Sequence, residues 1–226
     1  MATSAAEDVD GTRSGRPRGQ GQEGRRGHGD GQDWDRRYAA TARLFSAEPD
    51  PALVALAGSV PVGRALDLGA GEGRNSLWLA RNGWDVTAVD VSAVALGRLA
   101  EAASAQGSHV RTVVGDMQEL LTSGERYDLV VVCFIHPAPD RRASLLAGMA
   151  GAVAPGGDLF VAGHHLVSLG MAGPPDPDRL YTEDRVRDAF PSLRTLRLER
   201  RQRTTADGQV IVDLLVWAVQ PPGMPQ

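Results

Sequence analysis

Short apolar runs alternate with segments of helical periodicity through most of the chain. The pattern predicts strands at 64–68, 85–90, 109–114, 127–134 and 158–163, and helices at 34–43, 51–57, 74–82, 92–105 and 140–153. The strand at 127–134 is apolar along most of its length, which is typical of a strand buried on both faces of a sheet. Strands separated by helices predict right-handed βαβ units and a parallel sheet.

The C-terminal third has a different pattern. A helix is predicted at 182–190, followed by two β-rich runs at 194–203 and 209–219. The pair Asp207-Gly208 between these runs is a strong hairpin signal, so the last two strands are expected to pair antiparallel. The complete pattern predicts an α/β fold, namely a doubly wound, seven-stranded mixed sheet with a C-terminal antiparallel hairpin.

The first 33 residues have the composition of a tail. They hold eight glycines, five arginines and six acidic residues, and their only larger aliphatic residues are Met1 and Val9. Such a segment buries too little apolar surface to offset its conformational entropy. We therefore expect a disordered Gly/Arg-rich tail at 1–33 and one folded domain at 34–226.

Composition excludes several classes of protein. The 226 residues carry a net charge of −4, and neither a signal-peptide pattern nor an apolar run of membrane-spanning length is present. The chain shows no basic block for nucleic acid and no metal-ligand spacing, and Cys133 is its one cysteine. We expect a cytoplasmic protein without metal, membrane or nucleic-acid partners. Its oligomeric state stays open.

The stretch from Ala65 to Ser76 carries the candidate chemistry. A strand runs into the glycines 69, 71 and 73 and then into a helix, a geometry that brings backbone N–H groups close to a ligand. Asp90 ends the next strand, where a carboxylate can accept hydrogen bonds from a ribose diol. Dinucleotide domains prefer G-x-G-x-x-G, whereas here the spacing is G-x-G-x-G and Asp67 precedes it. A carboxylate at that position suits an ammonium group better than a pyrophosphate.

These motifs resemble the class I S-adenosylmethionine-dependent methyltransferases, and within them the small bacterial group near the tellurite-resistance and thiopurine methyltransferases. The resemblance rests on Asp67–Gly73, Asp90, Gly115-Asp116-Met117, Leu129–Phe134, Pro155-Gly156-Gly157 and Trp34–Tyr38, and it covers about 34–219. It implies a Rossmann-like fold in which the seventh strand lies antiparallel between the fifth and the sixth. It also implies S-adenosylmethionine as cofactor.

The resemblance assigns cofactor contacts to named positions: Asp67, Gly69, Gly71, Gly73, Arg74, Asp90, Val91, Asp116, Met117, Cys133, Trp34 and Tyr38. Asp116 and Met117 would contact the adenine, and Arg74 the carboxylate of the cofactor. Several positions also have a simpler explanation: Asp67 and Asp116 as turn caps, Asp90 as an acid at a helix start, Arg74 as surface, Cys133 as core, and Trp34 and Tyr38 as plugs at the core edge. Glu72 is expected to be solvated or a weak substrate contact.

Histidines follow two strands at the edge where open α/β sheets bind ligands. His136 follows the strand at 127–134, and His164 and His165 end the strand at 158–163. We predict His136 and His165 as catalytic residues that accept a proton from a hydroxyl or amine acceptor, with His164 as the alternative to His165. A thiol or an anion would need no base, and the three imidazoles could instead line a polar crevice or bind a metal. The predicted function is methyl transfer to a small molecule. The alternatives are an NAD(P)-dependent oxidoreductase and a non-catalytic cofactor-binding protein.

Overall fold

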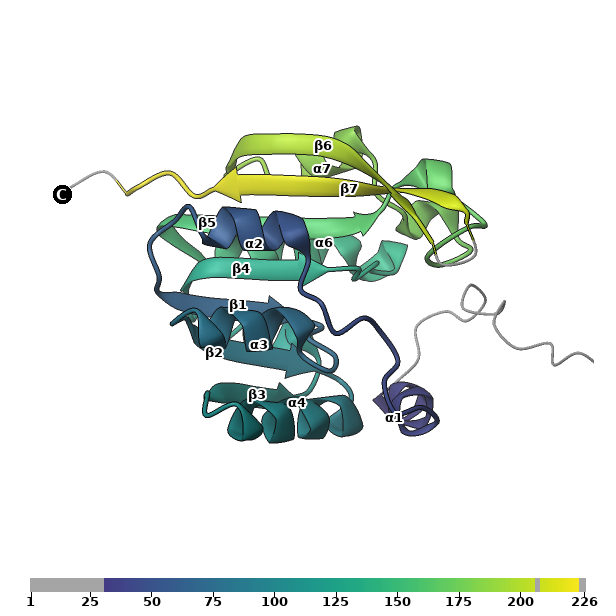
Figure 1. Ribbon diagram of the computed structural model, residues 1–226. Coiled ribbons are helices and arrows are strands. Elements are labelled where there is room, and N and C mark those ends of the chain that lie inside the picture. Colours follow the sequence, from purple (N-terminus) through teal and green to yellow (C-terminus); the bar gives the residue numbers. More distant parts are fainter. Residues whose placement is uncertain (1–30, 206–207, 224–226) are drawn as a thin grey trace, which may run out of the picture.

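A seven-stranded sheet forms the centre of the molecule (Figure 1). The computed structural model describes residues 31–205 and 208–223, and within these ranges the strand order is β3-β2-β1-β4-β5-β7-β6. The strands are β1 (Arg64–Leu68), β2 (Asp85–Asp90), β3 (Val110–Val114), β4 (Tyr127–Cys133), β5 (Val153–His164), β6 (Arg194–Thr204) and β7 (Val210–Val219). β1 to β5 pair in parallel, and β7 pairs antiparallel with both β5 and β6. The predicted mixed sheet and the placement of the seventh strand are confirmed.

Helices cover both faces of this sheet. They are α1 (Gly31–Ala39), α2 (Pro51–Ala57), α3 (Arg74–Arg81), α4 (Ala93–Ala105), α5 (Met117–Leu121), α6 (Pro139–Gly151) and α7 (Glu183–Ala189), with short 3-10 helices at Leu166–Ser168 and Pro177–Arg179. Figure 1 shows α2, α3 and α4 on one face and α6 and α7 on the other. In the ranges given above, none of the helices is both long and apolar enough to cross a bilayer.

Most predicted boundaries agree with the structure within one or two residues, but three elements differ. α1 spans 31–39 rather than 34–43, α5 follows β3 although no helix was predicted there, and β5 begins at Val153 rather than at residue 158. β5 includes Pro155-Gly156-Gly157, and the β4–β5 register shifts opposite this segment. Residues 31–33, predicted as part of the tail, begin α1 instead. The rest of the predicted tail, 1–30, and Asp207 of the predicted hairpin turn lie outside the described residues.

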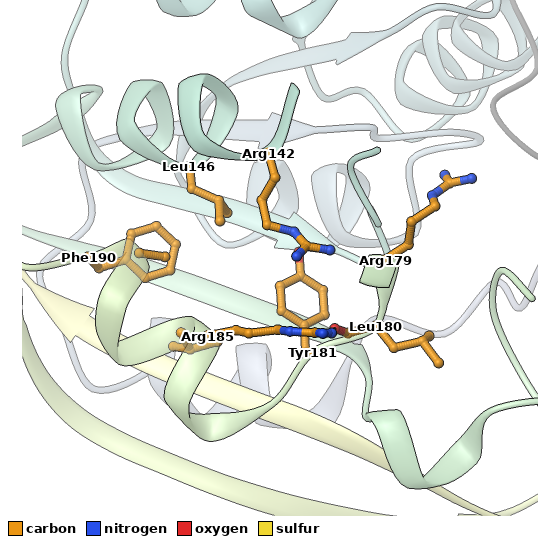
Figure 2. Close-up of a pocket in the computed structure, with 9 residues that line it drawn as sticks. Arg142, Leu146, Arg179, Leu180, Tyr181, Arg185 and Phe190 are labelled. Atoms are coloured by element: carbon orange, nitrogen blue, oxygen red, sulfur yellow. The ribbon is translucent and has the colours of Figure 1, made fainter. Parts of the chain in front are cut away.

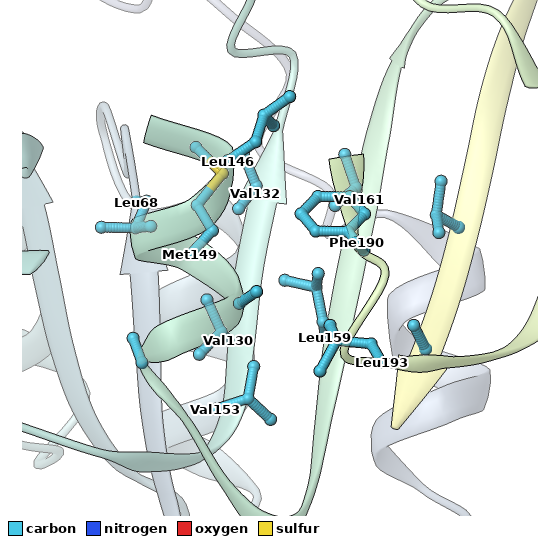
Figure 3. Packing of buried hydrophobic residues seen from close by; sticks show 14 of the residues in the cluster. Leu68, Val130, Val132, Leu146, Met149, Val153, Leu159, Val161, Phe190 and Leu193 are labelled. Carbon is cyan, nitrogen blue, oxygen red and sulfur yellow. The ribbon is translucent and has the colours of Figure 1, made fainter. Parts of the chain in front are cut away.

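The core has two layers because successive residues of a strand face opposite sides of the sheet. In β4, Val130 and Val132 belong to the layer under α6 and α7, whereas Leu129 and Val131 belong to the layer under α2, α3 and α4. Figure 3 shows the first layer, with Met149 and Leu146 of α6 packed over Val130 and Val132. The long apolar run of β4 is thus explained by burial on both faces.

Gly73 connects the glycine-rich loop to α3 in a left-handed conformation. Its φ is +79°, and a Cβ atom there would lie 2.1 Å from Cδ1 of Leu99 on α4.

We expect Gly73→Ala to lower the free energy of unfolding by about 2–4 kcal/mol, since backbone strain adds to overpacking. The matched control is Gly97→Ala on α4, where a new Cβ meets nothing within 4 Å. It should raise the free energy of unfolding by about 0.5–1 kcal/mol in the same urea titration. Equal effects of the two changes would contradict this account.

Candidate active site

Asp90 joins the loop after β1 to the loop after β2. Its Oδ2 accepts the backbone N–H of Gly71 at 2.8 Å, and its Oδ1 accepts that of Ser92 at 2.9 Å. Burial raises the pKa of Asp90, and the N–H groups of Ser92 and Gly71 oppose this effect. The N–H of Val91 also contacts this carboxylate, which offers about four acceptor positions, so acceptor capacity remains for a further donor. The geometry therefore allows Asp90 to hold the loops together and to accept hydrogen bonds from a diol.

Asp67 lies under the glycine-rich loop and is only 2% exposed. The hydroxyl of Ser76 on α3 donates to its Oδ2 at 2.6 Å. Burial raises the pKa of Asp67 to about 6, although the Ser76 hydrogen bond and the charge of Arg74 both lower it. A buried carboxylate of this kind gains most from a cation that replaces its lost hydration.

Arg74 begins α3 and reaches toward the end of β4. Its guanidinium carbon lies 5.4 Å from the ring centre of Phe134, and that of Arg203 lies 5.6 Å from the same ring. Phe134 follows β4 with a φ of +60°, a conformation that is uncommon for a side chain of this size. Cys133 precedes it, and burial raises the pKa of its thiol far above the usual range. Asp67, Arg74 and Cys133 therefore lie together, with the cysteine as a neutral thiol.

Asp116 and Met117 lie between β3 and α5. Asp116 caps α5, since its Oδ1 accepts the backbone N–H of Gln118 at 2.9 Å, and its Oδ2 lies 2.6 Å from Nη2 of Arg141. Met117 extends toward the glycine-rich loop, and its Cε lies 3.9 Å from the position that a Cβ of Gly69 would occupy. Asp116 therefore caps a helix, which was the simpler explanation considered for it from the sequence. Met117 lies next to the glycine-rich loop that is predicted to bind the cofactor.

α1 lies against the two loops that Asp90 joins. Oδ1 of Asp35 accepts the hydroxyl of Ser92 at 2.6 Å, and also the N–H of Val94. Tyr38 is buried, and its hydroxyl lies 2.7 Å from the position that a Cβ of Gly71 would occupy. The ring of Trp34 packs 5.9 Å from that of Tyr38. Glycine at position 71, with its φ of +54°, therefore leaves the room that Tyr38 needs.

Glu72 and Val91 also hold the N-terminal segment in place. Oε2 of Glu72 accepts the N–H of Leu44 at 2.9 Å, and its Oε1 pairs with Arg98 at 2.8 Å. Glu72 is 7% exposed, so the expectation of a solvated side chain is wrong. The carbonyl of Val91 lies against the backbone of Gly31, where α1 begins. Glu72 therefore fixes the segment that covers the glycine-rich loop, and Val91 lies against the start of this segment.

His136 follows β4, as predicted, but its ring is already engaged. Its Nε2 accepts the backbone N–H of His164 at 3.0 Å, and the two imidazoles stack at 5.1 Å with an interplanar angle of 8°. Burial lowers the pKa of His136 to about 3, and the charge of Arg179 adds to this effect. The ring is neutral with its acceptor nitrogen occupied, so this arrangement does not support His136 as a general base.

His165 points away from His136, because neighbouring residues at the end of β5 face opposite sides of the sheet. Its Nδ1 accepts the N–H of Val167 at 3.1 Å, and its Nε2 lies 3.1 Å from Oε2 of Glu183. Since both ring nitrogens are engaged, the geometry argues against the prediction of a proton acceptor at this position too. His164 is the histidine that lies beside His136.

A charge network at the ends of β6 and β7 was not predicted. Asp213 is fully buried. Its Oδ1 lies in hydrogen-bond distance of His164 Nδ1, at 3.0 Å, and its Oδ2 accepts a hydrogen bond from Arg203 Nε at 2.7 Å. Burial alone would raise the pKa of Asp213, but these hydrogen bonds hold it at about 2. Arg201 pairs with both carboxylate oxygens of Asp50, which precedes α2. One feature of the sequence could have predicted this network. Asp213 lies within the apolar run 210–219, and an acid that is buried there requires polar partners.

Comparison with known proteins identifies the family of this site. Residues 65–157, which hold the glycine-rich loop, Asp90 and the whole of β4, match the family model described as "Methyltransferase domain". This segment is similar to that family. The predicted resemblance to the class I S-adenosylmethionine-dependent methyltransferases is confirmed.

Solved structures extend the likeness of the methyltransferase domain beyond this segment. N-methyltransferase NodS from Bradyrhizobium japonicum WM9, in complex with S-adenosyl-L-homocysteine, has a TM-score of 0.68 at 20% identity, over 84% of this chain and 98% of that chain. TehB from Haemophilus influenzae has a TM-score of 0.65 at 21% identity, over 83% of this chain and 67% of that chain. At these identities the likeness shows the shared fold.

Curated relatives match a shorter part of the chain. The ribosomal RNA small subunit methyltransferase C of Alcanivorax borkumensis is 40% identical over 80 residues, which are 35% of this chain and 23% of the relative. The release factor glutamine methyltransferase of Bordetella pertussis shares 36% over 102 residues, 37% of its length. The chain thus spans about a quarter to two fifths of the curated relatives that it matches.

Proposed function

We propose that this protein binds S-adenosylmethionine and transfers its methyl group to a small molecule. The observation that carries the proposal is the buried Asp67 carboxylate beneath a glycine-rich loop that Asp90 ties to β2. A ligand with an ammonium at one end and a ribose diol at the other satisfies both carboxylates. A dinucleotide would instead bring its pyrophosphate close to Asp67, which disfavours the oxidoreductase alternative.

The residues around this site orient the cofactor and exclude water. Asp67 would hold the ammonium, Arg74 at the start of α3 the carboxylate, and Asp90 the ribose, while Met117 and the rings of α1 cover the loop. S-adenosylmethionine supplies a methyl group already activated by the sulfonium charge. The contribution of the protein is therefore mainly alignment of donor and acceptor.

Both predicted bases have their ring nitrogens engaged, which favours an acceptor that needs no base. His136 accepts a backbone N–H, and His165 is bonded to Val167 and Glu183. A thiolate or another nucleophile that is already anionic attacks without giving up a proton to the protein. We therefore propose a soft or anionic acceptor atom rather than a neutral hydroxyl.

Two arginines of β6 are paired within the fold, which favours a small-molecule acceptor rather than a nucleic acid. Arg200 pairs with Glu183 at 2.6 Å, and Arg203 with Asp213 at 2.7 Å, so their charges are balanced within the fold. A nucleic-acid surface would need arginines free to neutralise phosphates. Two curated relatives bear the names of ribosomal RNA and release factor methyltransferases, so macromolecules belong in the test.

Two measurements test the proposed function. In calorimetry, S-adenosylmethionine should bind and NADH should not; the reverse result would overturn the cofactor assignment. An assay of S-adenosylhomocysteine release over thiols, halides, oxyanions, phenols and amines, with ribosomal RNA and protein as additional arms, should show turnover with a soft or anionic small molecule. Binding without turnover on every acceptor would instead support a non-catalytic cofactor-binding protein.

A further inference from the structure

Two arginines lie against the ring of Phe134, at the carboxyl edge of the sheet. Leu68 ends β1 and pairs with Val132 of β4, so Phe134 comes just beyond the end of β1, where the glycine-rich loop begins. The ring centre of Phe134 lies 5.4 Å from the guanidinium carbon of Arg74 and 5.6 Å from that of Arg203. None of these three residues is buried, so a ligand can reach them from solvent. They lie at the edge where open α/β sheets bind ligands.

The backbone that follows Phe134 is held from the other face of the sheet. The hydroxyl of Tyr181 donates to the carbonyl of Ile135 at 2.7 Å. Tyr181 belongs to the core layer under α6 and α7, whereas Phe134 packs against the opposite layer. Figure 2 shows the ring of Tyr181 with Arg142 of α6 next to it. The position of the Phe134 ring is therefore fixed by packed neighbours and does not depend on a ligand.

Arg203 is oriented through only one of its N–H groups. Its Nε donates to Oδ2 of the fully buried Asp213 at 2.7 Å. In the ranges that the structure describes, its two terminal nitrogens, Nη1 and Nη2, have no hydrogen-bond partner. The side chain is 40% exposed. A guanidinium that is fixed through Nε keeps two parallel N–H donors for a further acceptor.

Asp213 also places His164 beside the same ring. Its Oδ1 lies 3.0 Å from Nδ1 of His164, and the imidazole lies 4.9 Å from the ring of Phe134. Oδ2 of Asp213 lies 3.3 Å from Nη2 of Arg201 as well. Because one buried carboxylate is shared by these groups, its contact with Arg203 orients the guanidinium and does not saturate it.

The neighbouring arginines of β6 do not have this capacity. Both terminal nitrogens of Arg201 donate to the carboxylate of Asp50, and the side chain is only 21% exposed. Arg200 uses Nε and Nη2 for the carboxylate of Glu183. Arg203 is therefore the arginine of this strand that can receive an anion at the end of β4.

We propose that Arg203 determines which acceptor is methylated, by binding a carboxylate that the acceptor carries, while Phe134 packs against the rest of the acceptor. This inference rests on the proposed function, in which Arg74 holds the carboxylate of the cofactor and Arg203 stays available. The planar fork of a guanidinium matches the two oxygens of a carboxylate. One oriented arginine suits one small anion, whereas a nucleic acid presents a row of phosphates and needs several free arginines.

Mercaptoacetate and mercaptoacetamide test the inference, since these two thiols differ only in the carboxylate. Ligand-observed NMR on the full chain with S-adenosylhomocysteine measures binding without turnover. The acid should bind more tightly than the amide. Arg203→Met should weaken binding of the acid by roughly tenfold or more, the usual loss for hydrogen bonds to a charged group, and leave binding of the amide unchanged. The matched control is Arg197→Met on the same strand, where the arginine is 53% exposed and lies 3.6 Å from Glu199. This variant should bind the acid as the wild type does.

Arg203→Lys provides a second variant, because Arg203→Met leaves the buried Asp213 with one partner fewer. Lysine keeps a positive charge beside Asp213 but lacks the parallel donors of the fork. Binding of the acid should weaken by roughly threefold or more, as for one lost hydrogen bond. Equal binding of acid and amide to the wild type would overturn the inference. Equal binding of the acid to the wild type and to both Arg203 variants would overturn it too.

Calorimetry with S-adenosylmethionine on the same samples separates this inference from the proposed function. Normal affinity for S-adenosylmethionine in the Arg203 variants shows that they are folded. If S-adenosylmethionine binds but mercaptoacetate binding does not depend on Arg203, the role of Arg203 is wrong and the cofactor assignment stands. If the wild type does not bind S-adenosylmethionine, the proposed function is wrong, and the inference fails with it.

Discussion

Asp67→Asn is expected to weaken S-adenosylmethionine binding by about 1.5–3 kcal/mol at pH 7.5, the usual contribution of a hydrogen bond to a charged group. Asparagine has nearly the same shape as aspartate, and its side-chain oxygen can still accept the hydroxyl of Ser76. The fold should therefore be retained while the negative charge opposite the ammonium is lost. Calorimetric titration of both proteins measures the difference. Unchanged affinity would remove Asp67 from the cofactor site.

The same residue should make cofactor binding depend on pH. In the free protein burial raises the pKa of Asp67 to about 6, whereas a bound ammonium favours the ionised form and lowers this pKa. Binding thus releases a proton when the pH is below about 6. Affinity should fall there as the pH falls, approaching a tenfold loss per pH unit.

Two variants control for this pH dependence. Asp67→Asn cannot titrate, so its affinity should be nearly constant between about pH 5 and 7, since the ammonium of the ligand, with a pKa near 8, stays charged there. Ser76→Ala removes the hydrogen bond that stabilises the carboxylate, so the fall in affinity should begin at a higher pH. An identical slope in the wild type and in Asp67→Asn would assign the titration to another group.

Local patterns predicted most of the fold because its signals are short in range. The short apolar runs of β1, β2 and β4, the capping Ser92 before α4 and the closing Gly58 after α2 each act within a few residues. α5 escaped prediction because five residues are too few to show a helical period.

The candidate site was predictable only where its residues lie next to strand ends in the sequence. Asp67 lies next to the end of β1 and Asp90 ends β2, so the fold class alone brings them to one edge. The hydrogen bond from the His164 N–H to His136 depends instead on how β4 and β5 lie relative to each other. Neighbouring strand residues always face opposite sides, but which of His164 and His165 faces His136 follows from strand register, which a count of histidines near a strand end cannot supply.

Asp90→Ala is expected to weaken S-adenosylmethionine binding by about 1–3 kcal/mol, or roughly 5- to 150-fold. The change removes the acceptor for the ribose diol and also frees the N–H groups of Gly71 and Ser92, which hold the glycine-rich loop in its binding conformation. The matched control is Asp85→Ala, an exposed aspartate at the start of the same strand, which should leave the affinity unchanged. If both variants bound the cofactor like the wild type, Asp90 would only connect the two loops. The assignment of Asp90 to the ribose of the cofactor would then be wrong.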